Sequence, residues 1–91
     1  MEITLQPEDN IRLANLCGAL DENIKQIETA LEVNINRRGG TFNISGKTDN
    51  MRLAAQMIEN FYVRAKKPLA LEDIQLGLVE VDKLKPEDVN S

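Results

Sequence analysis

Three short stretches of the chain alternate apolar and polar residues, a period of two that is typical of strands with one buried face. The first contains Ile3 and Leu5, and the other two flank a turn sequence, Arg-Gly-Gly, at residues 38–40. We therefore predict a hairpin in which residues 33–37 pair with residues 41–45. The residues expected on the buried face of the hairpin are Val33, Ile35, Phe42 and Ile44.

Elsewhere apolar residues recur three or four positions apart, which is the spacing of a helix with one buried face. We predict a first helix that ends at Gly18 and a second helix over residues 22–32. A third helix begins at Thr48 or Asp49, either of which can cap it, and ends before Lys66. Its buried face is expected to contain Met51, Ala54, Ala55, Ile58, Phe61 or Tyr62, and Ala65.

A fourth helix is predicted after Pro68, although Gly77 lowers its intrinsic stability. Its inner face is expected to contain Leu71, Ile74, Leu78 and Val81. The elements then follow the order β-α-α-β-β-α with an extra C-terminal helix. Three strands with helices on one face form an α+β two-layer sandwich. We assign residues 1–84 to this domain and residues 85–91 to a polar tail or a truncated linker.

The junction between the first two helices is the stretch on which the functional prediction rests. Gly18 accepts a positive φ angle without steric cost, which suits the end of a helix. Asp21 stands where an N-cap belongs, so we expect its carboxylate to accept hydrogen bonds from the first N–H groups of the second helix. Without such a cap, these N–H groups would form an anion site. Leu20 falls in the loop and is expected to be exposed.

Composition and charge narrow the function classes. The chain has 91 residues, of which 42% are apolar and 29% charged, and it carries a net charge of −4, so it has the composition of one small globular domain rather than of a disordered segment. An acidic domain is poorly suited to strong nonspecific binding of nucleic acid. The single Cys17 fits a reducing cytosol. The sequence contains neither a signal pattern nor an apolar run of membrane-spanning length, so we expect a cytoplasmic protein without membrane partners.

The residue types do not predict a catalytic site. The chain has no His, and N-capping accounts for the neighbouring carboxylates Asp21 and Glu22 without any metal. The tripeptide Gly46-Lys47-Thr48 imitates the end of a phosphate-binding P-loop, but five residues separate it from Gly40 where that motif has four. We expect neither ATP binding nor enzyme activity from this chain.

The element order, with a glycine at the corner between the first two helices, resembles the type I KH domain, which binds nucleic acids. The resemblance covers residues 17–28 and continues to residues 33–36. In KH domains this corner carries a G-x-x-G loop that clamps the nucleotide backbone. In this chain the first glycine is Gly18 and the position of the second is occupied by Asp21.

A closer resemblance is to the N-terminal region of PhoH-like ATPases, and it extends over residues 2–84. The segments on which this resemblance rests are residues 3–5, 9–10, 16–18, 21–28 and 35–38. In that family a KH-like region precedes a P-loop ATPase domain, and the family is associated with phosphate starvation and RNA metabolism. The resemblance implies an isolated N-terminal domain, with ATP and magnesium bound only by the absent ATPase domain. It also implies an rRNA-maturation endoribonuclease as a partner and self-association through the parent ATPase.

Two functions remain open from the sequence. The first is recognition or positioning of single-stranded RNA, for which the candidate binding residues are Gly18, Ala19, Leu20, Asp21, Lys25, Arg37 and Arg38. Arg37 and Arg38, with Lys25, Lys47 and Arg52, would then form a basic rim, although ordinary solvated charge explains them equally well. The second is a protein-interaction or oligomerisation module without affinity for RNA, which the net acidity and Asp21 favour.

Overall fold

The computed structural model describes residues 1–82, in which three strands form one antiparallel sheet. The strands are β1 (Glu2–Thr4), β2 (Asn34–Arg38) and β3 (Thr41–Ser45), and their order across the sheet is β1-β3-β2. The strand β3 therefore lies in the centre, where it pairs with both edge strands. The predicted polar tail over residues 85–91 lies outside the described residues.

The predicted hairpin is confirmed, with its first strand one residue later than expected. Arg38 pairs with Thr41 across a two-residue turn at Gly39 and Gly40, and Ile35 pairs with Ile44. Val33 precedes the strand instead of beginning it, but its side chain is buried as predicted. Because alternate residues of a strand point to opposite faces, Ile35 and Phe42 also lie on the buried face.

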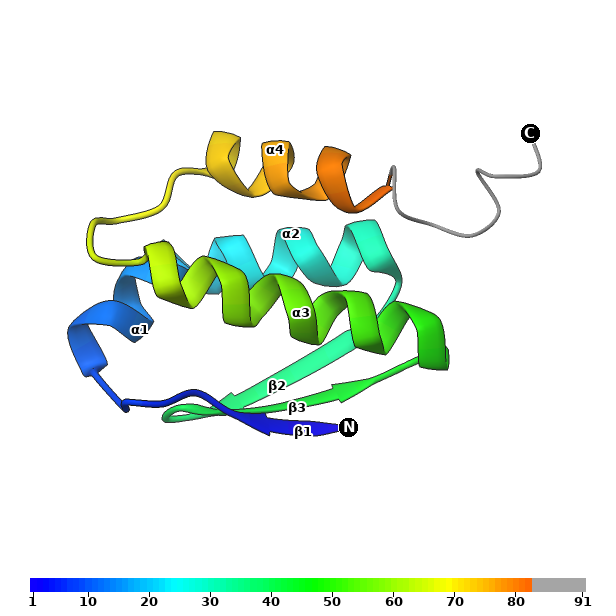
Figure 1. Cartoon of the computed structure of the whole chain (residues 1–91), viewed down its shortest axis with the longest axis horizontal. Helices are drawn as coiled ribbons and strands as arrows, with labels where there is room; N and C mark the ends of the chain where they lie inside the picture. Colours follow the sequence, from blue (N-terminus) through cyan, green and yellow to red (C-terminus); the bar gives the residue numbers. More distant parts are fainter. Residues whose placement is uncertain (83–91) are drawn as a thin grey trace.

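Four α-helices and one short 3₁₀ turn complete the described chain. They are α1 (Asn10–Cys17), η1 (Ala19–Asp21), α2 (Glu22–Leu31), α3 (Thr48–Arg64) and α4 (Leu71–Asp82). Figure 1 shows all the helices on one side of the sheet, with α4 on the far side of α2 and α3 from the strands. The fold is thus a small α+β domain in which α4 contacts α2 and α3 and adds an outer layer to the expected two.

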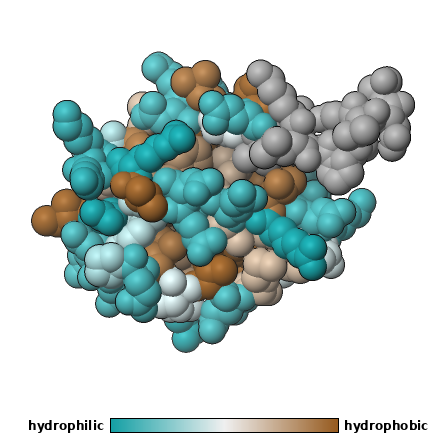
Figure 2. Space-filling model, in the orientation of Figure 1, coloured by the Kyte–Doolittle hydropathy of each residue, from teal (hydrophilic) through white to brown (hydrophobic). Residues whose placement is uncertain are grey.

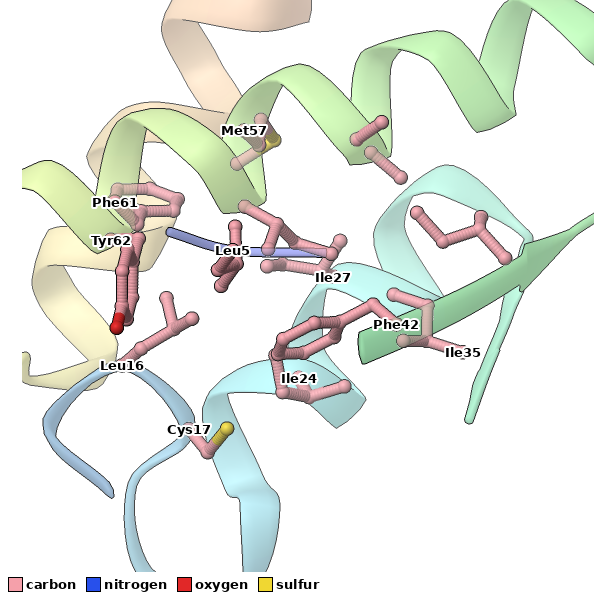
Figure 3. Close-up of a cluster of buried hydrophobic side chains, with 14 of the residues drawn as sticks. Leu5, Leu16, Cys17, Ile24, Ile27, Ile35, Phe42, Met57, Phe61 and Tyr62 are labelled. Atoms are coloured by element: carbon pink, nitrogen blue, oxygen red, sulfur yellow. The ribbon is translucent and has the colours of Figure 1, made fainter. Parts of the chain in front are cut away.

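The core lies between the sheet and the helices (Figure 3). Phe42 and Ile44 of the central strand are fully buried, and they pack with residues from three helices, including Leu16, Ile27 and Ile58. The helix stripe predicted for α3 is confirmed, since both Phe61 and Tyr62 are buried and only Met51 is partly exposed. The other side of the sheet carries polar side chains and stays open.

The structure corrects two expectations about the helices and adds one cap. Neither Thr48 nor Asp49 caps α3, whose N-cap position is Lys47 without a side-chain hydrogen bond. The capping aspartate that the sequence reading missed is Asp9, whose carboxylate accepts hydrogen bonds from the N–H groups of Ile11 and Arg12 at the start of α1. Leu71 was expected to be buried but is 37% exposed, and the side chain of Val81 lies outside the described part of the chain.

Gly77 lowers the helix propensity of α4, but it also allows close packing against Phe61. A Cβ atom added there would lie 2.3 Å from Cζ of Phe61, so the absence of a side chain lets the backbone of α4 approach the ring. None of the described helices combines the length and the apolar composition that are needed to cross a membrane.

Candidate functional site

The corner between α1 and α2 has an unusual backbone. Gly18 ends α1 with a φ of 78°, and its N–H donates to the carbonyl of Ala14, as expected for a glycine at a helix C-terminus. The two residues before α2 also have positive φ angles, 53° at Leu20 and 57° at Asp21. Left-handed backbone is costly for residues with a Cβ atom and occurs mainly where the surroundings hold it in place.

Asp21 does not cap α2, so the expectation that its carboxylate occupies the first N–H groups of that helix is wrong. Its side chain makes no capping hydrogen bond, and its backbone is left-handed instead of the extended form usual at an N-cap. The carboxylate instead lies 3.8 Å from Nη2 of Arg37, which comes from β2. The Arg37 and Asp21 side chains are 32% and 52% exposed, so water screens this ion pair and it contributes little to stability.

Leu20 is the most exposed large apolar side chain of the described residues, at 90%. Its exposure was predicted from its place in the loop. Ala19 and Asp21 are also exposed, so the corner presents three consecutive side chains to solvent. The side chain of Leu20 therefore gains nothing from burial within the domain, and its backbone is left-handed.

Two asparagines hold the corner against the segment that joins α3 to α4. The side-chain amide of Asn23 is fully buried and donates to the carbonyls of Leu16 (3.0 Å) and Leu69 (3.1 Å). Asn15 donates through its side chain to the carbonyl of Ala65 and accepts from the N–H of Leu69 through its backbone. Hydrogen bonds between distant parts of the chain therefore hold the segments on either side of the left-handed residues Leu20 and Asp21.

The asparagines bring a basic segment to the corner that the sequence reading missed. Lys66 and Lys67 lie between Ala65 and Leu69, the two residues bound by Asn15, and both are exposed. In the sequence these lysines predict only the end of a helix. The sequence does show an asparagine on either side of Gly18, Asn15 and Asn23. It does not show which distant carbonyls these asparagines bind, so it could not predict that the lysines lie here.

Of the residues expected in the basic rim, only Arg37 and Arg38 line one common hollow. Arg37 lies on the helix-covered face of β2, where its side chain reaches Asp21 and the carbonyl of Gly39. Arg38 points to the opposite, open face, because neighbouring residues of a strand alternate. There it borders a shallow hollow of about 570 Å³ with Glu2, Asn36 and Asn43, and Arg37 lines the same hollow.

The remaining cations lie elsewhere. Lys25 lines a groove between α2 and the start of α4, together with Gln26, Thr29 and Leu71. Lys47 and Arg52 belong to the N-terminal end of α3, which follows the far end of β3 from the hairpin turn. A strand of this length spans roughly 17 Å, so these two residues cannot join Arg37 at the corner.

Cys17, the last residue of α1, is also part of the corner and is buried. Burial raises the pKa of its thiol, an effect that the nearby Arg37 guanidinium partly offsets. A buried thiol with a raised pKa is a poor nucleophile at neutral pH. Cys17 therefore serves the core and not the chemistry of a site.

The chain matches no known family model, and no solved structure matches it.

Proposed function

We propose that this chain is a KH-like RNA-binding domain, related to the N-terminal region of PhoH-like ATPases, and that its α1–α2 corner contacts single-stranded RNA. In this proposal Gly18, Ala19 and Leu20 form the contact loop. Arg37 lies beside the loop through its contact with Asp21. ATP hydrolysis would belong to a separate ATPase domain of the parent protein.

The element order supports this proposal. A strand, two helices joined at a glycine, a hairpin and a long helix follow one another in the described chain, in the order given above for KH domains. The added helix α4 lies on the side of α2 and α3 away from the sheet, so it does not cover the sheet (Figure 1).

One observation carries the functional part of the proposal, namely that the carboxylate of Asp21 makes no capping hydrogen bond to the start of α2. An acidic side chain that capped this helix would occupy the N–H groups that attract a phosphate. Here the carboxylate faces Arg37 instead. An incoming phosphate can therefore compete with Asp21 for the guanidinium of Arg37 as well as approach the helix end.

A titration of the purified chain with a short single-stranded RNA of mixed sequence tests this proposal. Backbone amide shifts should change first at residues 18–21, and a duplex of the same length should cause smaller changes. Replacing Arg37 by Ala should weaken binding several-fold and lower the salt dependence by about one phosphate contact. Arg52→Ala is the matched control, since it removes the same charge at the far end of the molecule. Shifts absent from residues 18–21, or equal losses in both variants, would contradict the proposal.

The exposed Leu20 favours a second candidate function, a protein-interaction module that uses the same corner. A leucine at 90% exposure gains far more from an apolar pocket on a protein than from a phosphate backbone. The variant Leu20→Ser separates the two functions, because it should abolish a protein contact and reduce RNA affinity only in part. An rRNA-maturation endoribonuclease is the partner class that the family resemblance suggests for such an experiment.

A further inference from the structure

A second exposed region lies between α3 and α4, and Lys67 and Leu69 of the segment that the asparagines bind also line it. A groove of about 360 Å³ runs between the two helices, and its floor is formed by Phe61 and the bare backbone of Gly77. Each helix contributes a stripe with the spacing i, i+3, i+4, i+7. The stripe of α3 contains Met57, Asn60, Phe61 and Arg64, and the stripe of α4 contains Asp73, Leu76, Gly77 and Glu80.

Helix α4 carries two exposed apolar side chains on its outer side, beside the exposed polar residues Glu72 and Gln75. Ile74 faces inward and is fully buried, whereas Leu76 and Val79 are 66% and 54% exposed. Figure 2 shows apolar surface along the upper edge of the molecule, where α4 lies. A helix with apolar residues on both sides is typical of a helix that is covered on both sides, so the outer side of α4 is suited to a partner.

The charges beside the groove have opposite signs on its two walls. Arg64 and Lys67 stand on the α3 side, and Asp73 and Glu80 stand on the α4 side. The ion pair recorded within the described part of the chain joins Arg37 and Asp21, and it involves none of these four residues. A partner that fits must therefore offer an apolar ridge with acidic residues toward α3 and basic residues toward α4.

A second copy of this chain meets that requirement, and we propose that two copies associate through this groove as a two-fold dimer with antiparallel α4 helices. A two-fold axis near Gly77 places Leu76 of each copy over the groove of the other. It also brings Glu80 of one copy beside the N-terminal half of the other α4, where Arg64 and Lys67 line the groove. A symmetric contact needs one self-complementary surface, and a groove with an apolar ridge and two oppositely charged walls provides it.

Sedimentation velocity over a range of protein concentrations tests the dimer. The wild-type chain should show a concentration-dependent dimer. The variant Leu76→Glu should weaken association by about ten-fold or more, because it places a charge in an apolar contact at the dimer centre. Ile11→Glu is the matched control, since Ile11 of α1 is equally exposed, at 75%, but lies outside the groove. Circular dichroism melts should show that both variants remain folded.

A charge-exchange series tests the pairing itself. Arg64 and Glu80 also line one small pocket within a single chain. Arg64→Glu and Glu80→Arg should each weaken the dimer several-fold, whereas an equimolar mixture of the two single variants should associate, because each variant then meets its opposite charge on the other copy. A wild-type chain that remains monomeric at millimolar concentration would overturn the proposal and leave the groove to another partner. A dimer that Leu76→Glu does not weaken would overturn it as well.

Discussion

The α1–α2 corner and the α3–α4 groove both expose apolar side chains beside charged ones, but they are maintained in different ways. The corner depends on polar tethers, since the amide of Asn23 and the side chain and backbone of Asn15 bind a segment about 50 residues away in sequence. The groove depends on a missing side chain, since Gly77 leaves room over the ring of Phe61. The corner is thus fixed by directional bonds, and the groove by close packing.

Because the corner and the groove are maintained differently, we expect different kinds of substitution to destabilise them. Loss of a buried hydrogen-bond donor affects the corner, because its backbone conformation is strained and needs support. An added methyl group affects the groove, because packed surfaces tolerate little extra volume. Changes in one region should therefore leave the other nearly unaffected, and the effects of paired changes should add.

The largest effect is expected from Asn23→Ala. The change removes one buried and one partly buried hydrogen bond and leaves the carbonyls of Leu16 and Leu69 without this donor. It should lower the free energy of unfolding by about 2–4 kcal/mol and increase hydrogen exchange in residues 18–21. Urea unfolding and amide exchange measure the two effects. Asn34→Ala, at an exposed position of β2, is the control and should cost less than about 0.5 kcal/mol.

The next largest effect is expected from Gly77→Ala. The new methyl group would overlap the ring of Phe61, which is buried and cannot move freely. The chain should lose about 1–3 kcal/mol of stability despite the higher helix propensity of alanine. The self-association described above should also weaken, whereas amide shifts at the corner should stay unchanged. A gain in stability would show that α4 does not approach Phe61 this closely. Gln75→Ala, at an exposed position of the same helix, serves as the control.

A smaller effect is expected from the two substitutions of Asp21 by Gly and by Asn. Glycine fits the φ of 57° better than aspartate does, so Asp21→Gly should change stability by no more than about 1 kcal/mol and should not lower it. Both variants should raise RNA affinity by a few-fold at low salt, because removal of a charge ~5 Å from a phosphate is worth roughly 1 kcal/mol. The gain should shrink with added salt.

Asp49→Asn is the control for the Asp21 variants, since it removes one carboxylate at the far end of the molecule. The comparison is made by RNA titrations at two salt concentrations with thermal melts alongside. Folded Asp21 variants that bind RNA no better than the wild type would favour protein interaction as the role of the corner.

The smallest effect is expected at the β3–α3 junction, which belongs to neither region. The chain should not bind ATP, and Lys47→Ala should change neither its nucleotide binding nor its stability by a measurable amount. Phe42 and Ile44 are buried in the central strand, so the residues before Gly46 cannot form a flexible phosphate loop. Saturable ATP binding that disappears in Lys47→Ala would contradict this prediction.

Local patterns in the sequence determined most of the fold. The alternation on either side of residues 38–40 fixed the hairpin and the residues on its buried face, with an error of one residue at the start of β2. The helical spacing after Thr48 identified the buried face of α3. The lack of a Cβ atom at Gly18 predicted the end of α1. The position of Leu20 in the loop predicted that its side chain is exposed. Each of these inferences depends on residues that are near one another in the chain.

Only the tertiary structure decided what the polar side chains of the site do. Asp21 was expected to cap its own helix, but its partner is Arg37 on a strand that follows α2. Asn23 binds Leu69, and Gly77 accommodates Phe61, across separations that no periodic pattern encodes. A side chain chooses among all the groups that the fold brings within reach, and the local backbone angle decides where it points. For Asp21 that angle is left-handed, and it is supported by contacts that form only when the whole chain has folded.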